Sequence, residues 1–161
     1  MPVTPVQFYQ LVNRLSGLSV APQQDIDGSQ LIQANPGDPI QPQFLWGFIQ
    51  VGIGKYRIFN YFSGLCVDVG GGSTPINGEA VQQYHWKPDI GNQQWYLNGD
   101  DTNGYFFESA LDRNFVWDVA ESSRDPGAGL VVNAKTGGQD QQWKADPRSA
   151  VLVSAAQSGA D

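Results

Sequence analysis

The sequence has little cysteine and little histidine, and this limits the chemistry that it can support. Cys66 is the single cysteine and His85 the single histidine among 161 residues. One cysteine cannot form an internal disulfide, and one histidine cannot build a Cys- or His-rich zinc site. A catalytic triad would need a nucleophile and an acid around His85, and no motif marks either. We therefore predict no metal and no cofactor, a surface position for His85, and a packed interior thiol for Cys66.

Positive charge is also scarce. The chain has 9 Lys and Arg against 16 Asp and Glu, which gives a net charge of −7. Nucleic acids and anionic membranes attract clusters of Lys and Arg, so we predict neither as a partner. No stretch approaches the ~20 apolar residues of a membrane span, so no membrane insertion is expected. The first residues, Met1–Pro5, do not resemble a signal peptide, which predicts a cytoplasmic protein or one released by a non-classical route.

The residues that are abundant are typical of an all-β protein. Apolar residues make up 40% of the chain and include five Trp, six Tyr and eight Phe, enough to form a buried core. The chain also contains 19 Gly and 10 Pro. Turn signals such as Asn77-Gly78 and Asn103-Gly104 recur at short intervals. This pattern predicts many short strands joined by tight turns, and it fits a helical bundle poorly.

Three segments of the chain repeat the same landmarks in the same order. Each has a strand-like segment, at Leu18–Ala21, Leu65–Val69 and Phe115–Val119. Each then closes on Gln-x-Trp or a degraded form of it, at Gln43–Trp46, Gln93–Trp95 and Gln141–Trp143. We predict repeats at about 8–50, 56–98 and 105–146, each of about four strands, packed around a shared axis. They form one domain over 1–146, and a tail over 147–161 carries an apolar patch, Ala150–Val153, expected to pack on that domain.

Alternation within the strand-like segments assigns their two faces. Val67 and Val69 share one face, as do Trp117 and Val119, and this face is expected to form the core. Asp68 and Asp118 then project to the opposite side, where we expect their carboxylates to be solvated. We also expect the repeated Trp95 and Trp143 to be buried core residues.

The repeats and their Gln-x-Trp endings resemble the ricin B-type (R-type) lectin family, whose fold is the β-trefoil. The resemblance covers the chain from about Phe8 to Ala145, and Val81–Trp86 followed by Asn92–Trp95 is most similar to fungal intracellular members. It implies a non-catalytic carbohydrate-binding protein for galactose or N-acetylgalactosamine, with glycans or glycoproteins as partners. A single shallow sugar site binds weakly, so useful avidity needs further sites or a homodimer.

The resemblance implies one complete sugar site, in the second repeat. The residues that match the sugar-binding positions of the family are Asp68, Gln82, Tyr84, Asn92 and Gln93. A carboxylate and an amide suit sugar hydroxyls, and an aromatic ring suits the C–H face of a pyranose.

The other two repeats match less well. The third is a weaker candidate site, formed by Asp118, Asn133, Asp140 and Gln141, because it lacks the aromatic residue and has Asp140 in place of the asparagine. The first repeat has Ala21 in place of the aspartate and no aromatic residue near Ala34, so we predict that it is structural.

Other interpretations of these residues stay open. Asp68 and Asp118 could serve only in turns at strand ends, and Gln93 and Gln141 could hold the fold together through hydrogen bonds. A β-trefoil protease inhibitor is an alternative function, acting through the exposed loops Gln33–Gln43 and Glu121–Gly129. A glycosidase is not expected, because its two carboxylates must face one cleft, whereas Asp68 and Asp118 belong to different repeats.

Overall fold

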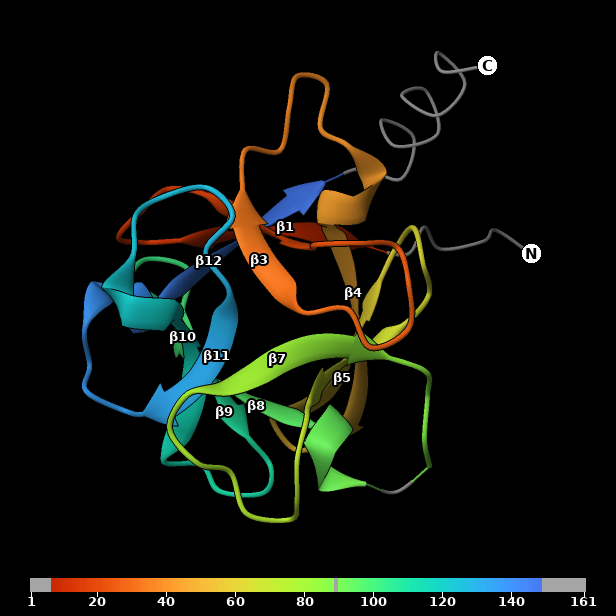
Figure 1. Cartoon of the computed structure of the whole chain (residues 1–161), viewed down its shortest axis with the longest axis vertical. Coiled ribbons are helices and arrows are strands. Elements are labelled where there is room, and N and C mark those ends of the chain that lie inside the picture. Colours follow the sequence, from red (N-terminus) through yellow and green to blue (C-terminus); the bar gives the residue numbers. More distant parts are fainter. Residues whose placement is uncertain (1–6, 89, 149–161) are drawn as a thin grey trace.

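The computed structural model describes residues 7–88 and 90–148, which form three lobes of the same plan (Figure 1). Lobe 1 comprises β1 (Phe8–Asn13), β2 (Ser19–Pro22), β3 (Leu31–Ala34), the 3-10 turn η1 (Pro42–Phe44) and β4 (Leu45–Gly52). Lobe 2 comprises β5 (Lys55–Asn60), β6 (Cys66–Val69), β7 (Glu79–Tyr84), η2 (Gly91–Gln93) and β8 (Trp95–Asp100). Lobe 3 comprises β9 (Gly104–Ser109), β10 (Phe115–Val119), η3 (Ala120–Ser122), β11 (Leu130–Ala134), η4 (Gln139–Gln141) and β12 (Trp143–Arg148).

The first and last strands of each lobe form a closed barrel. β1 pairs with β4, β4 with β5, β5 with β8, β8 with β9, β9 with β12, and β12 with β1. Closing the ring removes the exposed edges that an open sheet would present. The barrel with its three lobes confirms the predicted all-β trefoil of about four strands per repeat. None of the helical segments in the described part of the chain has the length and apolarity needed to cross a bilayer.

The middle strands of each lobe form a hairpin that covers one end of the barrel. These hairpins are β2–β3, β6–β7 and β10–β11. They meet around the central axis, where β11 pairs with β7 and single bridges join Gln30 to Gln82 and Ile32 to Gly129 (Figure 1). The three hairpins therefore support one another, as expected of repeats too small to fold alone.

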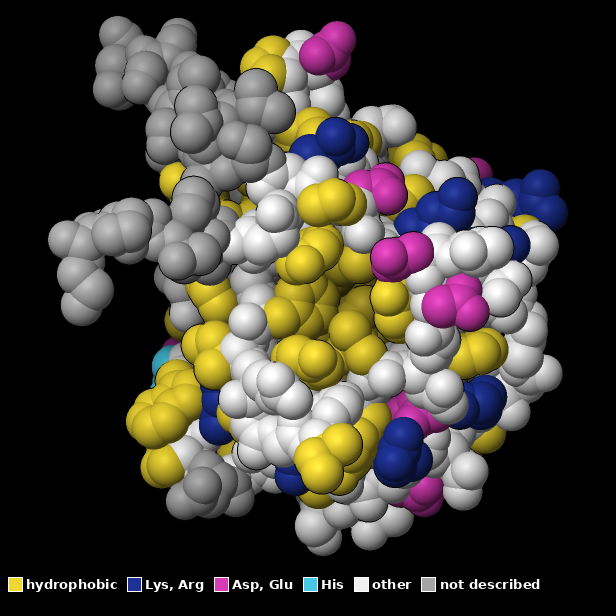
Figure 2. Space-filling view, turned by 180° about the vertical axis from the view of Figure 1, so that it is seen from behind, with side chains coloured by type: hydrophobic (Ala, Val, Ile, Leu, Met, Phe, Trp, Pro, Cys, Tyr) yellow, Lys and Arg dark blue, Asp and Glu magenta, His cyan; other side chains and the backbone are white. Residues whose placement is uncertain are grey.

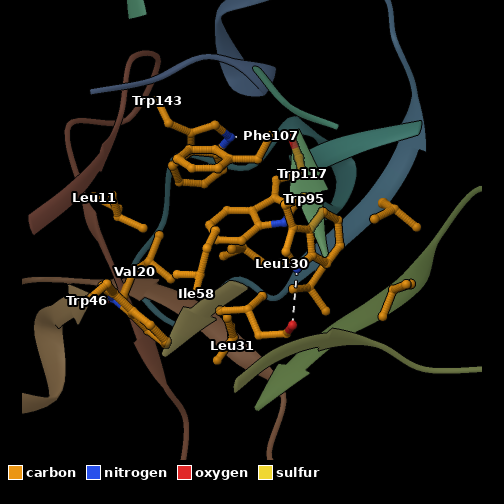
Figure 3. Packing of buried hydrophobic residues seen from close by; sticks show 14 of the residues in the cluster. Leu11, Val20, Leu31, Trp46, Ile58, Trp95, Phe107, Trp117, Leu130 and Trp143 are labelled. Atoms are coloured by element: carbon orange, nitrogen blue, oxygen red, sulfur yellow. Dashed lines mark hydrogen bonds between the residues drawn. The ribbon is translucent and has the colours of Figure 1, made fainter. Parts of the chain in front are cut away.

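The core follows the same threefold plan. The indole N–H groups of Trp46, Trp95 and Trp143 donate to the carbonyls of Val20, Val67 and Trp117, at 3.0, 3.1 and 3.3 Å. All three tryptophans are fully buried, as predicted for Trp95 and Trp143 (Figure 3). Each Gln-x-Trp ending therefore fastens the last barrel strand of its lobe to the hairpin of the same lobe.

The alternation rule predicted one face of the hairpin strands correctly and the other wrongly. Val67, Val69, Trp117 and Val119 are buried in the core, as expected. Asp68 and Asp118, however, are only 5% exposed and not solvated. The 3-10 turn η2 packs against β6 and the 3-10 turn η4 packs against β10, and these turns shield Asp68 and Asp118 from solvent. Cys66 is also buried, as predicted, and burial raises the pKa of its thiol.

The last strand ends at Arg148, just beyond the predicted repeat boundary. The predicted apolar patch Ala150–Val153 lies outside the described residues.

Candidate functional site

A recess of about 270 Å³ lies on the outer side of the lobe 2 hairpin. Its walls come from the end of β6, the end of β7 and the turn η2, and from the loop that turns at Gly71 with φ of +87°. Asp68, Gln82, Tyr84 and Asn92, four of the five predicted sugar-binding residues, line this recess. The structure thus brings these four side chains to one place, at a size close to the ~300 Å³ of small ligand pockets.

Asp68 is the acidic residue among those that line the recess. Its Oδ1 accepts a hydrogen bond from Gln82 Nε2 at 3.3 Å, and its Oδ2 accepts one from Gln93 Nε2 at 3.1 Å. A carboxylate has about four acceptor positions, so these bonds leave capacity for further donors. Burial raises the pKa of Asp68, while the two glutamine bonds and the positive charge of Lys87 oppose that rise. The side chain is therefore a partly desolvated acceptor that faces a recess.

Asn92 and Tyr84 complete the polar and aromatic lining. Asn92 Nδ2 donates to the carbonyls of Val69 and Gly72, at 3.0 and 3.4 Å, which fixes the side chain against the loop after β6. Among the described residues nothing donates to Asn92 Oδ1, so this oxygen is available to a ligand. The half-buried Tyr84 ring adds an apolar surface to the same recess.

Gln93, the fifth predicted sugar-binding residue, does not face the recess. Its side chain is fully buried, and its Nε2 donates to Asp68 Oδ2 and to the carbonyl of His85. Its Oε1 accepts from Arg57 at 2.6 Å and from the backbone N–H of Lys87 at 2.9 Å. Gln93 therefore lies behind Asp68 and not among the residues that line the recess. The residue instead holds Asp68 and the loop after β7 in place, as the structural alternative expected.

Lys87 was not predicted as a site residue, yet it lines the recess. Its ammonium lies 4.5 Å from the centroid of the Tyr84 ring, close enough for a cation–π contact. Nothing in the local sequence marks Lys87, because its place depends on how the loop after β7 folds back over Gln93. His85 lies at the surface as predicted, with its Nδ1 2.7 Å from Asp27 Oδ2 of lobe 1.

The equivalent carboxylate in lobe 3 has more partners. Asp118 Oδ1 accepts from the backbone N–H of Val119 at 2.7 Å. Its Oδ2 accepts from Asn133 Nδ2 at 3.0 Å and from Gln141 Nε2 at 3.1 Å. Burial raises the pKa of Asp118, and the neighbouring Asp140 carboxyl raises it further. The carboxylate of Asp118 is therefore largely occupied by protein donors.

The remaining lobe 3 candidates also differ from lobe 2. Strand register places Asn133 opposite Val116, just as Tyr84 lies opposite Cys66, so an amide stands where lobe 2 has its ring. Asp140 accepts from Ser122 Oγ at 2.9 Å. Gln141 is buried and bonds to Asp118 and Ala134, so it has the structural role of Gln93 and does not face a ligand.

Lobe 1 lacks the polar pair altogether. Ala21 takes the place of the aspartate and Phe44 the place of the buried glutamine, and both are buried, with η1 packed against β2. Ala34 stands where lobe 2 has Tyr84. These positions support the prediction that lobe 1 is structural. Over the described residues no group of three or more His, Cys, Asp or Glu is placed to hold a metal ion.

Comparison with protein families assigns the chain. Residues 3–84 match the model of the ricin-type β-trefoil lectin domain-like family, and residues 54–159 match that of the ricin-type β-trefoil lectin domain. The chain therefore belongs to the ricin-type β-trefoil lectin domain family, as the repeats predicted. Membership favours carbohydrate binding over catalysis and over protease inhibition. Among curated protein sequences, none matches the chain.

Solved structures show the same fold. A designed threefold-symmetric protein, ThreeFoil, is 28% identical with a TM-score of 0.77, over 86% of this chain and 97% of that one. An exo-β-1,3-galactanase from Clostridium thermocellum is 25% identical with a TM-score of 0.77, over 91% of this chain but 31% of its own. A ricin B-like lectin from Macrolepiota procera, in complex with lactose, is 18% identical with a TM-score of 0.72, over 91% of this chain and 99% of that one.

Proposed function

We propose that the recess in lobe 2 binds a terminal galactose or N-acetylgalactosamine residue of a glycan or glycoprotein, without catalysing a reaction. The observation that carries this proposal is the position and hydrogen bonding of the Asp68 carboxylate. Its carboxylate lines the recess beside Tyr84 and Asn92, and protein donors leave part of its acceptor capacity unfilled.

Each lining group suits one part of a pyranose. Asp68 accepts hydrogen bonds from two neighbouring hydroxyls, and a charged acceptor makes these bonds stronger than neutral ones. Asn92 Oδ1 accepts a further hydroxyl, while its Nδ2 stays bonded to the loop. The Tyr84 ring covers the C–H face of the sugar, which displaces the Lys87 ammonium that lies 4.5 Å from the ring centroid. A galactose ring suits this arrangement because its axial 4-hydroxyl leaves a continuous C–H face on the opposite side.

The relatives support the galactose class. The Macrolepiota procera lectin is in complex with lactose, which ends in galactose, and the Clostridium thermocellum relative is a β-1,3-galactanase. A shallow single site of this kind binds a monosaccharide with a Kd of about 1 mM, equivalent to about 4 kcal/mol. Tight binding to a cell surface or glycoprotein then requires several sites on one target, through a homodimer or a longer chain.

A glycan array probed with the whole chain, followed by calorimetry with lactose, tests this proposal. We expect signal confined to glycans that end in galactose or N-acetylgalactosamine. We expect loss of that signal in Asp68→Ala, which should stay folded but melt at a lower temperature because the buried Gln93 amide loses an acceptor. The same protein is assayed against a panel of proteases, because the segments Gln33–Gln43 and Glu121–Gly129 are the surface predicted for the alternative function. Binding to no glycan together with inhibition of a protease would overturn the lectin proposal in favour of the inhibitor.

A further inference from the structure

A second, larger cavity of about 690 Å³ opens at the mouth of the barrel. All six barrel strands or their turns contribute to its walls, and no residue of the three hairpins does. It therefore lies at the end of the barrel that the hairpins leave open, and shares no residue with the recess in lobe 2. Figure 2 shows the molecule from behind the hairpins, with a hollow in the centre of the face and apolar side chains on its floor.

Four aromatic side chains contribute to the walls of this cavity. Tyr9, Phe48, Tyr56 and Tyr105 come from four different barrel strands. The Phe48 ring meets Tyr9 edge-on at 5.3 Å and Tyr56 edge-on at 6.0 Å between centroids. Mutual edge-on packing fixes these rings around one space. Among the described residues, nothing forms a hydrogen bond with the hydroxyls of Tyr9 and Tyr56.

The rim of the cavity is acidic. Asp101, in the turn between β8 and β9, accepts a hydrogen bond from the Tyr105 hydroxyl at 2.8 Å. This bond, burial and the charges of Asp100 and Asp101 raise the pKa of Tyr105 to about 12. Asp146 lies on the same rim, and Lys144 is its one cationic residue among those that the structure describes. The electrostatic field at the rim therefore favours positive charge.

We propose that the barrel mouth is a second binding site, for a small organic cation that carries an apolar group, such as an aryl- or alkylammonium compound. Its apolar part enters the space between Tyr9, Phe48 and Tyr56, and its ammonium group stays at the rim near Asp101 and Asp146. The volume lies within the ~300–1,000 Å³ of small-molecule sites.

Two features select this class of ligand over others. The carboxylates of Asp101 and Asp146 at the rim attract the ammonium group, and the aromatic rings of the cavity contact the apolar part of the ligand. An anion would meet the same carboxylates and the overall charge of −7. A neutral apolar compound would gain from the rings but not from the rim. Cationic, anionic and neutral compounds of similar shape can all place an apolar group in the cavity. They should differ in affinity because of their charge.

Benzyltrimethylammonium and its uncharged isostere neopentylbenzene form a matched pair of probes, with benzylsulfonate as the anion. Titration of the whole chain is followed by amide chemical shifts in two-dimensional NMR. We expect the cation to bind more tightly than the isostere and to shift amides of β9 and β12. Asp101→Asn, an exposed substitution, should weaken cation binding about fivefold, as expected for one unit charge a few ångströms away. Tyr84→Ala and saturating lactose should leave cation binding unchanged.

Equal affinity for the cation and its isostere, or tighter binding of benzylsulfonate, would overturn the proposal. So would cation-induced shifts that map to β6 and β7, or competition by lactose, because these would place the ligand in the recess of lobe 2. Failure of this proposal leaves the sugar site untouched, since the two sites share no residue.

Discussion

Lobes 2 and 3 carry the same buried pair of side chains but differ in what else the aspartate binds. In both lobes the glutamine of Gln-x-Trp donates to the aspartate at 3.1 Å. In lobe 3, Asp118 also accepts from the Val119 N–H and from Asn133. In lobe 2, Asp68 has one further bond, a long one of 3.3 Å from Gln82. The comparison teaches that the aspartate alone does not make a binding site, because its first role is to satisfy a buried glutamine.

Lobe 1, which lacks both the aspartate and the glutamine, supports the same conclusion. Replacing only the aspartate would leave a buried glutamine amide without an acceptor, which costs about 1–3 kcal/mol. Ala21 and Phe44 replace the two members together, so neither is left unpaired. The aspartate and the glutamine therefore behave as one structural unit, and sugar binding in lobe 2 is an added use of that unit.

The sharpest way to break the comparison is to neutralise the two aspartates separately. Asp68→Asn should weaken lactose binding about 10- to 150-fold, because it removes a charged acceptor of hydrogen bonds. Asp118→Asn should leave the affinity unchanged. Isothermal titration calorimetry measures both variants, and circular dichroism checks that each is folded. Equal losses in the two variants would mean that lobe 3 binds the sugar as well.

The two buried glutamines should differ in function but not in stability. Gln93→Ala and Gln141→Ala each leave buried partners unsatisfied, and each should lower the free energy of unfolding by about 1–3 kcal/mol. Urea denaturation measures this loss. Only Gln93→Ala should also weaken lactose binding, because Gln93 positions Asp68. If Gln93→Ala lost lactose binding with no fall in the free energy of unfolding, Gln93 would instead contact the sugar directly.

Exchanging the aromatic position sharpens the comparison further. Tyr84→Ala should weaken lactose binding about tenfold, the value of an aromatic contact of this kind. Asn133→Tyr places a ring at the equivalent position in lobe 3 but should create no second site, because Val119 and Gln141 still occupy Asp118. The number of lactose molecules bound per chain, from calorimetry, reports the outcome. Two per chain in Asn133→Tyr would show that the ring and not the carboxylate separates the lobes.

The smallest expected effect is that of pH. The pKa of Asp68 is raised by burial above its ordinary 3.8. Only the ionised carboxylate is a full acceptor, so binding should be complete at neutral pH and should fall as the pH drops through this raised pKa. The decline should begin at a higher pH than for a solvent-exposed aspartate, and Asp68→Asn should abolish the pH dependence. Lactose titrations between pH 7 and pH 4 measure it.

Much of the fold could be predicted from the sequence because the repeat fixes it at several points at once. Trp95 and Trp143 occupy equivalent positions in two repeats. Few folds can bury a large ring at both of these positions. The alternation of apolar residues along the hairpin strands also placed Val67 and Trp117 in the core correctly. Alternation failed for Asp68 and Asp118 because it assumes that one face of each strand meets solvent, whereas η2 packs against β6 and η4 against β10.

The site could be predicted only in part. Asp68, Tyr84 and Asn92 were assigned to one site because they match the sugar-binding positions of the ricin B-type family. Asn92 lines the recess while Gln93 faces inward, because neighbouring residues of a 3-10 turn point in different directions. Lys87 was missed because the course of the loop after β7 depends on hydrogen bonds to Arg57, 30 residues earlier in the chain, and to Gln93, six residues later.

A crystal structure of the chain soaked with lactose tests the central claim most directly, that the spare acceptor capacity of Asp68 receives the hydroxyls of the sugar. We predict one galactose ring per chain, stacked on Tyr84, with two of its hydroxyls within hydrogen-bond distance of the Asp68 carboxylate. Lactose bound at Asp118, or bound in lobe 2 without touching Asp68, would contradict the account.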